Sequence, residues 1–94
     1  MAAEVVMYCT AFCPYCVMAE RLLAAKGVAV RKVRVDQDAQ ARARMERLSG
    51  RRTVPQVFIG GRHVGGFTDL ARLEQAGELD GLLGGDPAAH TENC

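Results

Sequence analysis

Residues 5–16 read Val5-Val6-Met7-Tyr8-Cys9-Thr10-Ala11-Phe12-Cys13-Pro14-Tyr15-Cys16. Residues 4–8 are rich in side chains that favour strands, so they predict a short strand. Pro14 suits the first position of a helix, because the N–H that it lacks would have no helical partner there. Apolar residues then recur at helical spacing, at Met18, Leu22 and Leu23. This stretch therefore predicts a strand that passes directly into a helix, with two cysteines at the junction.

The middle of the chain repeats the strand and helix signals. Residues 28–35 predict a second strand. Asp36 or Asp38 predicts the N-cap of a second helix, which ends at Gly50. The expected inward face of this helix carries Ala41, Met45 and Leu48.

The last part of the chain predicts a hairpin followed by a helix. Residues 56–59 and 63–65 flank Gly60-Gly61-Arg62, a turn signal between two short strands. Thr68 or Asp69 then opens a third helix, which stops at Gly77. Its expected inward face carries Leu70, Leu73 and Ala76, and a final turn holds Leu79, Leu82 and Leu83.

The predicted order β-α-β-α-β-β-α gives an α/β fold with a four-stranded mixed β-sheet flanked by helices. A helical crossover makes the first two strands parallel, and the hairpin makes the last two antiparallel. The 94 residues leave room for one domain only. We expect that domain at residues 1–83 and a flexible C-terminal tail at residues 84–94, where turn-forming residues replace the apolar pattern.

The composition is that of an ordinary globular domain. There are 12 basic and 11 acidic residues, and 49% of the chain is apolar. This balance argues against nucleic acid as a partner, and the longest apolar runs are far shorter than the ~20 residues that cross a membrane. The first residues lack the pattern of a secretory signal, so we expect a cytoplasmic protein whose thiols stay reduced.

The pair Cys13 and Cys16 carries the predicted chemistry. Residues three apart lie on one side of a helical turn, so the two sulfurs can form and break a disulfide with little backbone movement. Cys13 stands at the helix N-terminus, where free N–H groups stabilise a thiolate. Cys16 lies one turn further in and should stay protonated longer. Cys13 is therefore expected to attack a disulfide, and Cys16 to resolve the intermediate.

A zinc site is the main competing interpretation of the pair. Such a site needs further ligands, and the candidates Cys9, His63, His90 and Cys94 show no ligand spacing. No metal is therefore expected. Cys9 is expected to be a small buried hydrophobic residue rather than a third redox thiol, and Cys94 an exposed thiol in the tail.

Three segments resemble those of the dithiol glutaredoxins of bacteria, which belong to the thioredoxin-like superfamily. They are Cys13-Pro14-Tyr15-Cys16, Thr53-Val54-Pro55 and Gly65-Gly66-Phe67-Thr68-Asp69. The resemblance implies a thioredoxin-like fold and glutathione-dependent reduction of protein disulfides and of glutathione mixed disulfides. It also implies glutathione as the reducing cosubstrate, no resident cofactor, disulfide or glutathionylated proteins as partners, and a monomer.

The resemblance also implies a glutathione site. Pro55 would follow a cis peptide bond that leaves the Val54 backbone free to pair with glutathione, beside Thr53. Gly66, Thr68 and Asp69 would receive the γ-glutamyl group, with backbone N–H groups for its carboxylate and the Asp69 carboxylate for its ammonium. Tyr15 would lie beside the thiols.

One position departs from the family pattern. Members commonly carry a lysine three residues before the first cysteine, where this chain has Thr10. Arg51 or Arg52 could supply the missing positive charge. Two other functions stay open: a dimer that shares a [2Fe–2S] cluster through Cys13 and glutathione thiolates, and a redox-inactive binding module.

Overall fold

A four-stranded sheet forms the centre of the molecule. The computed structural model describes residues 3–84. Its strands are β1 (Val5–Cys9), β2 (Val30–Arg34), β3 (Gln56–Ile59) and β4 (Arg62–Gly65), in the spatial order β2-β1-β3-β4. β1 pairs with β2 in parallel and with β3 antiparallel, and β3 pairs antiparallel with β4. The predicted four-stranded mixed sheet is confirmed.

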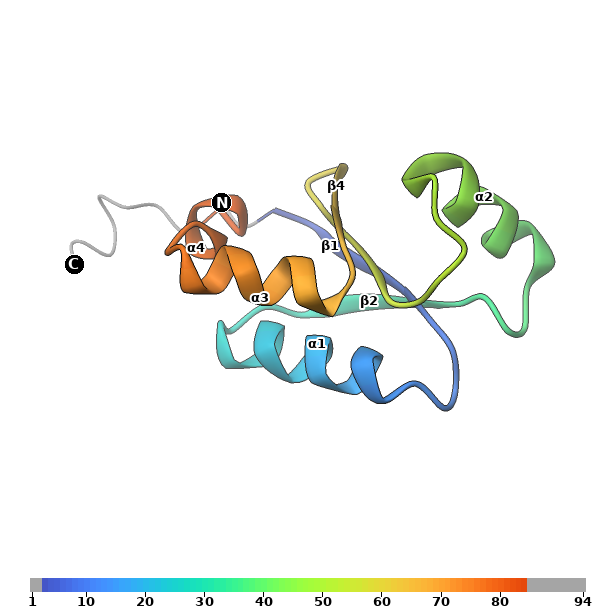
Figure 1. The fold of residues 1–94 in the computed structure, drawn as a ribbon, viewed down its shortest axis with the longest axis horizontal. Coiled ribbons are helices and arrows are strands. Elements are labelled where there is room, and N and C mark those ends of the chain that lie inside the picture. The colour runs from blue at the N-terminus through green and yellow to red at the C-terminus, as the bar shows by residue number, and fades with distance from the viewer. Residues whose placement is uncertain (1–2, 85–94) are drawn as a thin grey trace.

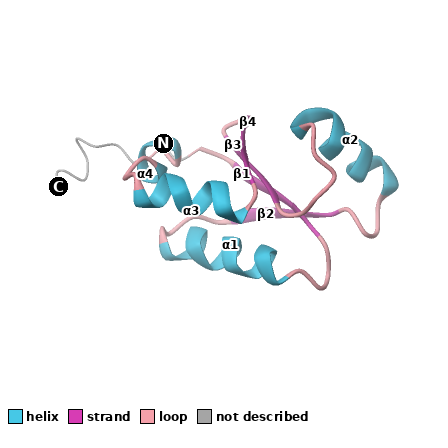
Figure 2. Ribbon diagram, in the orientation of Figure 1, coloured by secondary structure: helices cyan, strands magenta, loops and turns pink. Residues whose placement is uncertain are grey.

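Helices cover both faces of this sheet (Figures 1 and 2). They are α1 (Pro14–Ala25), α2 (Ala39–Ser49), α3 (Phe67–Gln75) and the short α4 (Leu79–Leu82). α1 and α3 lie side by side, while α2 lies apart from them, at the upper right of Figure 1. The predicted element order is confirmed, and α4 corresponds to the expected final turn.

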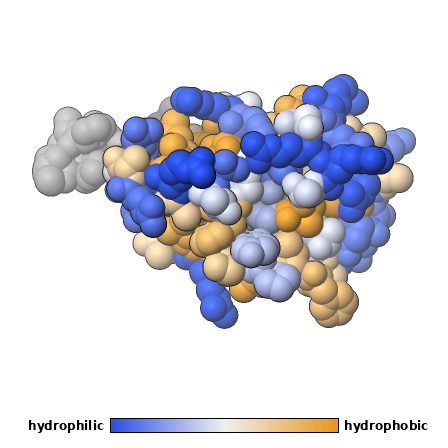
Figure 3. Space-filling view, viewed as in Figure 1, coloured by the Kyte–Doolittle hydropathy of each residue, from blue (hydrophilic) through white to orange (hydrophobic). Residues whose placement is uncertain are grey.

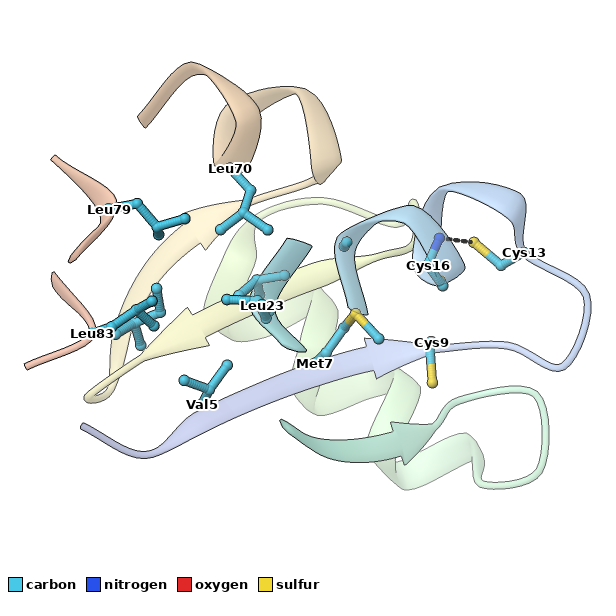
Figure 4. Packing of buried hydrophobic residues seen from close by; sticks show 12 residues of the cluster. Val5, Met7, Cys9, Cys13, Cys16, Leu23, Leu70, Leu79 and Leu83 are labelled. Carbon is cyan, nitrogen blue, oxygen red and sulfur yellow. Dashed lines mark hydrogen bonds between the residues drawn. The ribbon is translucent and has the colours of Figure 1, made fainter. Parts of the chain in front are cut away.

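The two faces of β1 bury different side chains, as the two-residue period of a strand requires. Val5, Met7 and Cys9 pack into a cluster with residues of α1, α3 and α4, shown in Figure 4. Tyr8 faces the other way and joins a second cluster with Phe58 and residues of α2. β1 is therefore buried on both sides, which explains why its sequence is continuously apolar.

The pairing of β1 with β3 brings distant parts of the chain together. Tyr8 lies opposite Gln56 in the antiparallel register, so the end of β1 lies beside the beginning of β3. The loop that leaves β1 carries the two cysteines to the start of α1, and the segment that enters β3 carries Pro55. The sheet thus places two of the three predicted site segments side by side, where β1 ends and β3 begins.

The structure selects one of the two expected caps of α2 and contradicts part of its expected buried face. Asp38, and not Asp36, caps α2, with its carboxylate accepting from the N–H groups of Gln40 and Ala41. Leu48 borders an open cavity beside Phe58, so 52% of its surface stays exposed. The sequence offers two aspartates where one cap is needed, and the structure selects the second of them.

The third helix also differs from expectation at both ends. It begins at Phe67, with Gly66 as N-cap, rather than at Thr68 or Asp69. It ends at Gln75, so Ala76 lies in the C-cap and is exposed instead of facing inward. Leu70 is fully buried, as predicted.

Residues 1–2 and 85–94 lie outside the described residues, so nearly all of the predicted tail, with His90 and Cys94, lies outside them too. The predicted domain boundary at residue 83 therefore stays a prediction. Among residues 3–84, no helix has the length and apolarity that crossing a membrane requires.

Candidate active site

Cys13 is the N-cap residue of α1. Its backbone is extended, and its Sγ accepts a hydrogen bond from the Cys16 N–H at 3.2 Å (Figure 4). This N–H is one of the helix-terminal donors that have no partner within the helix. A donor held at this position stabilises negative charge on the sulfur. The sequence prediction placed Cys13 at the helix N-terminus, and the structure confirms that position.

Cys16 lies in the first turn of α1 and faces the core. Its side chain packs in the cluster between β1 and α3, with 5% of its surface exposed. Burial, together with the hydrogen bond to Cys13, raises the pKa of the Cys16 thiol to about 12. Cys16 therefore stays protonated at neutral pH, as the sequence predicted.

The segment before β3 lies next to Cys13. The Cys13 Sγ is 3.9 Å from the Val54 carbonyl oxygen, although 41 positions separate the two residues. The Val54–Pro55 peptide bond is cis, which confirms that part of the prediction. Pro55 is buried and Thr53 is exposed, so the segment runs from the surface into the sheet beside the sulfur.

Asp69 organises the beginning of α3. Its Oδ2 accepts from the Gly66 N–H at 3.0 Å and from the Arg51 side chain at 3.0 Å. These two donors, the arginine first, hold the pKa of Asp69 below its ordinary value. The carboxylate is therefore ionised, but one of its oxygens already has two partners within the protein.

Gly65 makes this arrangement possible. Its φ of +122° is a conformation that other residues rarely adopt, and a Cβ there would collide with the Asp69 carboxylate. A Cβ on Gly66 would meet only the Pro55 carbonyl oxygen, at 3.4 Å. The sequence prediction assigned the site role to Gly66, whereas the structure makes Gly65 the position that requires glycine.

The two arginines before Thr53 have different surroundings. Arg51 reaches across to Asp69, while Arg52 lies 3.7 Å from Glu46 with 86% of its side chain exposed. Only Arg51 borders the cavity formed by the predicted site residues. The structure therefore distinguishes between two candidates that the sequence left equal.

A groove of about 300 Å³ unites the predicted glutathione residues. Of its lining residues, the sequence predicted Tyr15, Thr53, Val54, Pro55, Gly66, Thr68 and Asp69. Arg51, Gln56 and Phe67 complete the lining. The Tyr15 ring stacks on that of Phe67, with 6.3 Å between centroids, so the aromatic pair forms the wall nearest α1. All seven predicted residues thus border one groove.

A second cavity, of about 380 Å³, is lined by the thiols themselves. Cys9, Cys13 and Cys16 line it together with Thr10, Lys32 and others. Cys9 is 4% exposed, and burial raises the pKa of its thiol, in keeping with the buried hydrophobic residue predicted there. All three cysteines of residues 3–84 are unpaired thiols. No group of three or more potential metal ligands comes together in the described part of the chain.

Several large apolar side chains near the thiols are exposed. Phe12, directly before Cys13, is 97% exposed, and Tyr15, Val17 and Met18 are also exposed. Figure 3 shows apolar side chains over α1 and the loop before it, with hydrophilic side chains above them. Met18 therefore faces solvent, although its spacing predicted a buried position.

Sequence reasoning missed two residues that help to build the groove. Phe67 stacks on Tyr15, and Gln56 has a fully buried side chain. The polar Gln56 in an otherwise apolar strand was the available signal, because a polar side chain at a core position needs partners.

Known proteins share this arrangement. The glutaredoxin family model matches residues 5–64. A glutaredoxin of Neisseria meningitidis serogroup A is 61% identical over 80 residues, which cover 84% of this chain and 94% of the relative. Glutaredoxin 3 of Escherichia coli K12 is 46% identical over 81 residues, which cover 86% of this chain and 98% of the relative.

Solved structures agree with the sequence comparison. The structure of a buckwheat glutaredoxin–glutathione complex matches with a TM-score of 0.80 at 29% identity, over 87% of this chain and 77% of that chain. The sheet order, the thiol pair at the start of α1 and the family match lead to one conclusion. The chain belongs to the glutaredoxin family and is a glutathione-dependent thiol–disulfide oxidoreductase with a thioredoxin-like fold.

Proposed function

We propose that Cys13 is the nucleophile and Cys16 the resolving thiol of this enzyme. The Cys13 thiolate attacks one sulfur of a substrate disulfide, forms a mixed disulfide and releases the other sulfur as a thiolate, which takes up a proton. In the dithiol route, Cys16 loses its proton and attacks Cys13. This step releases the second substrate thiolate and leaves a Cys13–Cys16 disulfide, which two glutathione molecules reduce to the dithiol while they become glutathione disulfide.

A glutathione mixed disulfide follows a shorter route. Cys13 attacks the glutathione sulfur and releases the protein thiol, and a second glutathione then attacks the mixed disulfide on Cys13. Glutathione disulfide leaves, and the Cys13 thiolate is regenerated. Cys16 takes no part in this route, which is why the two cysteines can be separated by experiment.

The contrast between the two sulfurs carries the proposal. The Cys13 Sγ has a helix-terminal N–H directed at it, whereas Cys16 is buried with its pKa raised to about 12. A nucleophile needs thiolate character, and a resolving thiol needs only to reach the first sulfur after the mixed disulfide has formed. The surroundings of each sulfur therefore support these different roles.

We further propose that the groove holds glutathione. The Val54 backbone would pair with the extended tripeptide beside Cys13, in the manner of an added strand. Backbone N–H groups at Thr68 and Asp69, in the first turn of α3, would receive the γ-glutamyl carboxylate, and the Asp69 side chain its ammonium. Thr53, Pro55 and Tyr15 would form the walls. The likeness to a glutaredoxin solved with glutathione supports this placement.

The remaining features of the proposal concern the whole protein. Protein disulfides and glutathionylated proteins are its substrates, and it acts as a monomer without a resident cofactor. The cytoplasm is its compartment, because the glutathione pool there keeps the dithiol reduced. Light scattering would test the monomer, and iron content with visible absorbance would reveal a shared cluster.

Cysteine variants test the assignment of the two thiols. Cys13→Ser should abolish both reduction of a protein disulfide and removal of glutathione from a glutathionylated peptide. Cys16→Ser should lose the first activity and keep the second, because glutathione itself can resolve the mixed disulfide. Cys9→Ser is the matched control and should keep both, since burial and its position in β1 hold Cys9 in the core.

Two outcomes contradict the assignment. Activity of the Cys13 variant in either assay would show that another thiol attacks. Loss of both activities in a folded Cys16 variant would show that Cys16 does more than resolve the intermediate.

A further inference from the structure

Gln56 occupies an unusual position at the wall of the groove. It is the first residue of β3, follows Pro55 directly, and its surface is 0% exposed. Its side-chain Nε2 donates to the Thr53 carbonyl oxygen at 3.0 Å and lies 3.2 Å from the Thr53 hydroxyl. The buried amide therefore ties residues 53–55 to the sheet from the inside.

The oxygen of the Gln56 amide determines which ring nitrogen of His63 carries a hydrogen. Because the Thr53 carbonyl can only accept, the Gln56 nitrogen faces it and the Gln56 Oε1 faces His63. That oxygen lies 2.7 Å from the His63 Nε2, and an amide oxygen can only accept. His63 thus carries a hydrogen on Nε2, and the bonds form a chain from His63 through Gln56 to Thr53.

His63 is held in place by its own surroundings. It lies half-buried on β4, with its ring 5.0 Å from that of Phe58. Burial, and then the positive charge of Arg51, lower its pKa, while the nearby Asp69 carboxylate acts in the opposite sense. A neutral ring whose hydrogen is on Nε2 satisfies the buried amide without placing a second cation beside Arg51.

We propose that Gln56 and His63 are positioning residues, which hold residues 53–55 in the conformation that receives glutathione. The inference rests on the proposed glutathione groove, and it adds two residues to which no role had been given. Neither acts on the sulfur. Gln56 borders the groove, His63 lies behind it, and both act through the Thr53 and Val54 backbone.

The hydrogen-bond chain should therefore affect glutathione binding and leave the thiol unchanged. Loss of one buried hydrogen bond corresponds to about a threefold to tenfold change in an equilibrium constant. If the chain acts only by shaping the groove, this loss should appear in KM for glutathione, with kcat nearly constant.

Variants of His63 provide the test. His63→Phe keeps an aromatic ring against Phe58 but removes the donor, and it should raise the KM for glutathione about threefold to tenfold. His63→Gln restores an N–H near the position of Nε2 and should bring KM back to within about twofold of the original. Leu48→Ala is the control, because Leu48 borders the same cavity as His63 and Phe58 but belongs to no such chain.

Two further measurements separate this inference from the proposed function. Alkylation of Cys13 by iodoacetamide should proceed at the same rate in all of these variants, since the sulfur is not altered. In the unmodified protein, ¹⁵N NMR of His63 should show the tautomer with hydrogen on Nε2. This spectrum stays informative even if a variant fails to fold.

The inference is overturned if His63→Phe leaves the KM for glutathione unchanged, if His63→Gln fails to restore it, or if the spectrum shows hydrogen on Nδ1 alone. The assignment of Cys13 and Cys16 would survive each of these results. It depends on the cysteine variants, which do not alter the hydrogen-bond chain.

Discussion

Identical side chains have different chemistry at positions 13 and 16, and the same holds for the arginines at positions 51 and 52. Both thiols are buried, but the Cys13 Sγ accepts a helix-terminal N–H, whereas burial and the hydrogen bond to Cys13 raise the pKa of Cys16. Arg51 bonds to Asp69 at the groove, whereas Arg52 extends into solvent beside Glu46. In both pairs the position along the backbone decides the surroundings of the side chain.

Arg51 should supply the positive charge that Thr10 does not. Arg51→Ala should raise the KM for glutathione about tenfold, because a charge-assisted hydrogen bond contributes roughly 1.5 to 3 kcal/mol. Arg52→Ala should change it less than about twofold, since exposed ion pairs contribute little. Thr10→Lys should lower KM and partly rescue Arg51→Ala. Steady-state kinetics with varied glutathione would check each variant.

The opposite result would also be informative. A lower KM in Arg51→Ala would show that Arg51 competes with the glutathione ammonium for the Asp69 carboxylate. The basic residues between positions 31 and 52 would then serve only as a solvated surface.

The junction between β4 and α3 shows how a helix start can shape a binding site. Gly65 turns the chain, Gly66 caps α3, and Asp69 returns its carboxylate to the Gly66 N–H. This bond satisfies a helix-terminal donor and fixes the carboxylate at the groove. In the sequence the segment looks like a simple turn and helix cap, yet its geometry holds the Asp69 carboxylate at the groove.

Two glycine variants separate the effect of backbone strain on stability from the effect of a displaced Asp69 carboxylate on glutathione binding. Gly65→Ala and Gly77→Ala both force a side chain into a positive φ, of +122° and +74°, so each should destabilise the fold by about 1–3 kcal/mol. Only at Gly65 does the new Cβ meet Asp69, whereas at Gly77 no atom lies within 4 Å. Urea unfolding and KM for glutathione would compare them.

The two variants should differ in the KM for glutathione. Gly65→Ala should raise the KM for glutathione several-fold, while Gly77→Ala should lose stability alone. Equal KM values in the two variants would mean that the Asp69 carboxylate has no part in binding glutathione.

The order of strands and helices could be predicted because each element carries its own periodic signal. The burial of Leu70, the position of Cys13 and the cis bond before Pro55 agree with prediction. What could not be predicted depends on contacts between distant segments. Leu48 has the spacing of a buried residue, but it borders an open cavity and is 52% exposed.

The same reason applies to the site. The bond from Arg51 to Asp69 and the bond from His63 to Gln56 join different elements, and no local pattern marks them. The sequence left Asp36 and Asp38 open as helix caps for a related reason, because Asp36 is occupied elsewhere. Its carboxylate binds Arg34 and the Ala11 N–H, and so joins the loop before α1 to the end of β2.

Asp36 makes the stability of the whole fold depend on pH. The Arg34 guanidinium, together with the Ala11 N–H, holds the pKa of Asp36 well below its ordinary value. An unfolded aspartate titrates near ~3.9, so the stabilisation is fully present above that pH and is lost as the pH falls through the folded pKa. Asp36→Asn should therefore unfold at lower urea at pH 6, with a smaller further loss at pH 3.

Asp38→Asn is the matched control for this experiment. Asparagine caps a helix about as well as aspartate, so the urea midpoint at pH 6 should stay close to that of the unmodified protein. An equal loss between pH 6 and pH 3 in Asp36→Asn and the unmodified protein would show that other carboxylates dominate the acid sensitivity.

The separation of Cys13 from Val54 along the chain has a consequence for biosynthesis. The two residues meet beside one sulfur, although 41 positions separate them. At roughly 5–20 residues per second, translation delivers Val54 about 2 to 8 s after Cys13. During that interval the nascent chain already carries both thiols, but the segment that will lie against the Cys13 sulfur has not yet been made. The contact between Cys13 and Val54 can therefore form only after more than half of the chain has been synthesised.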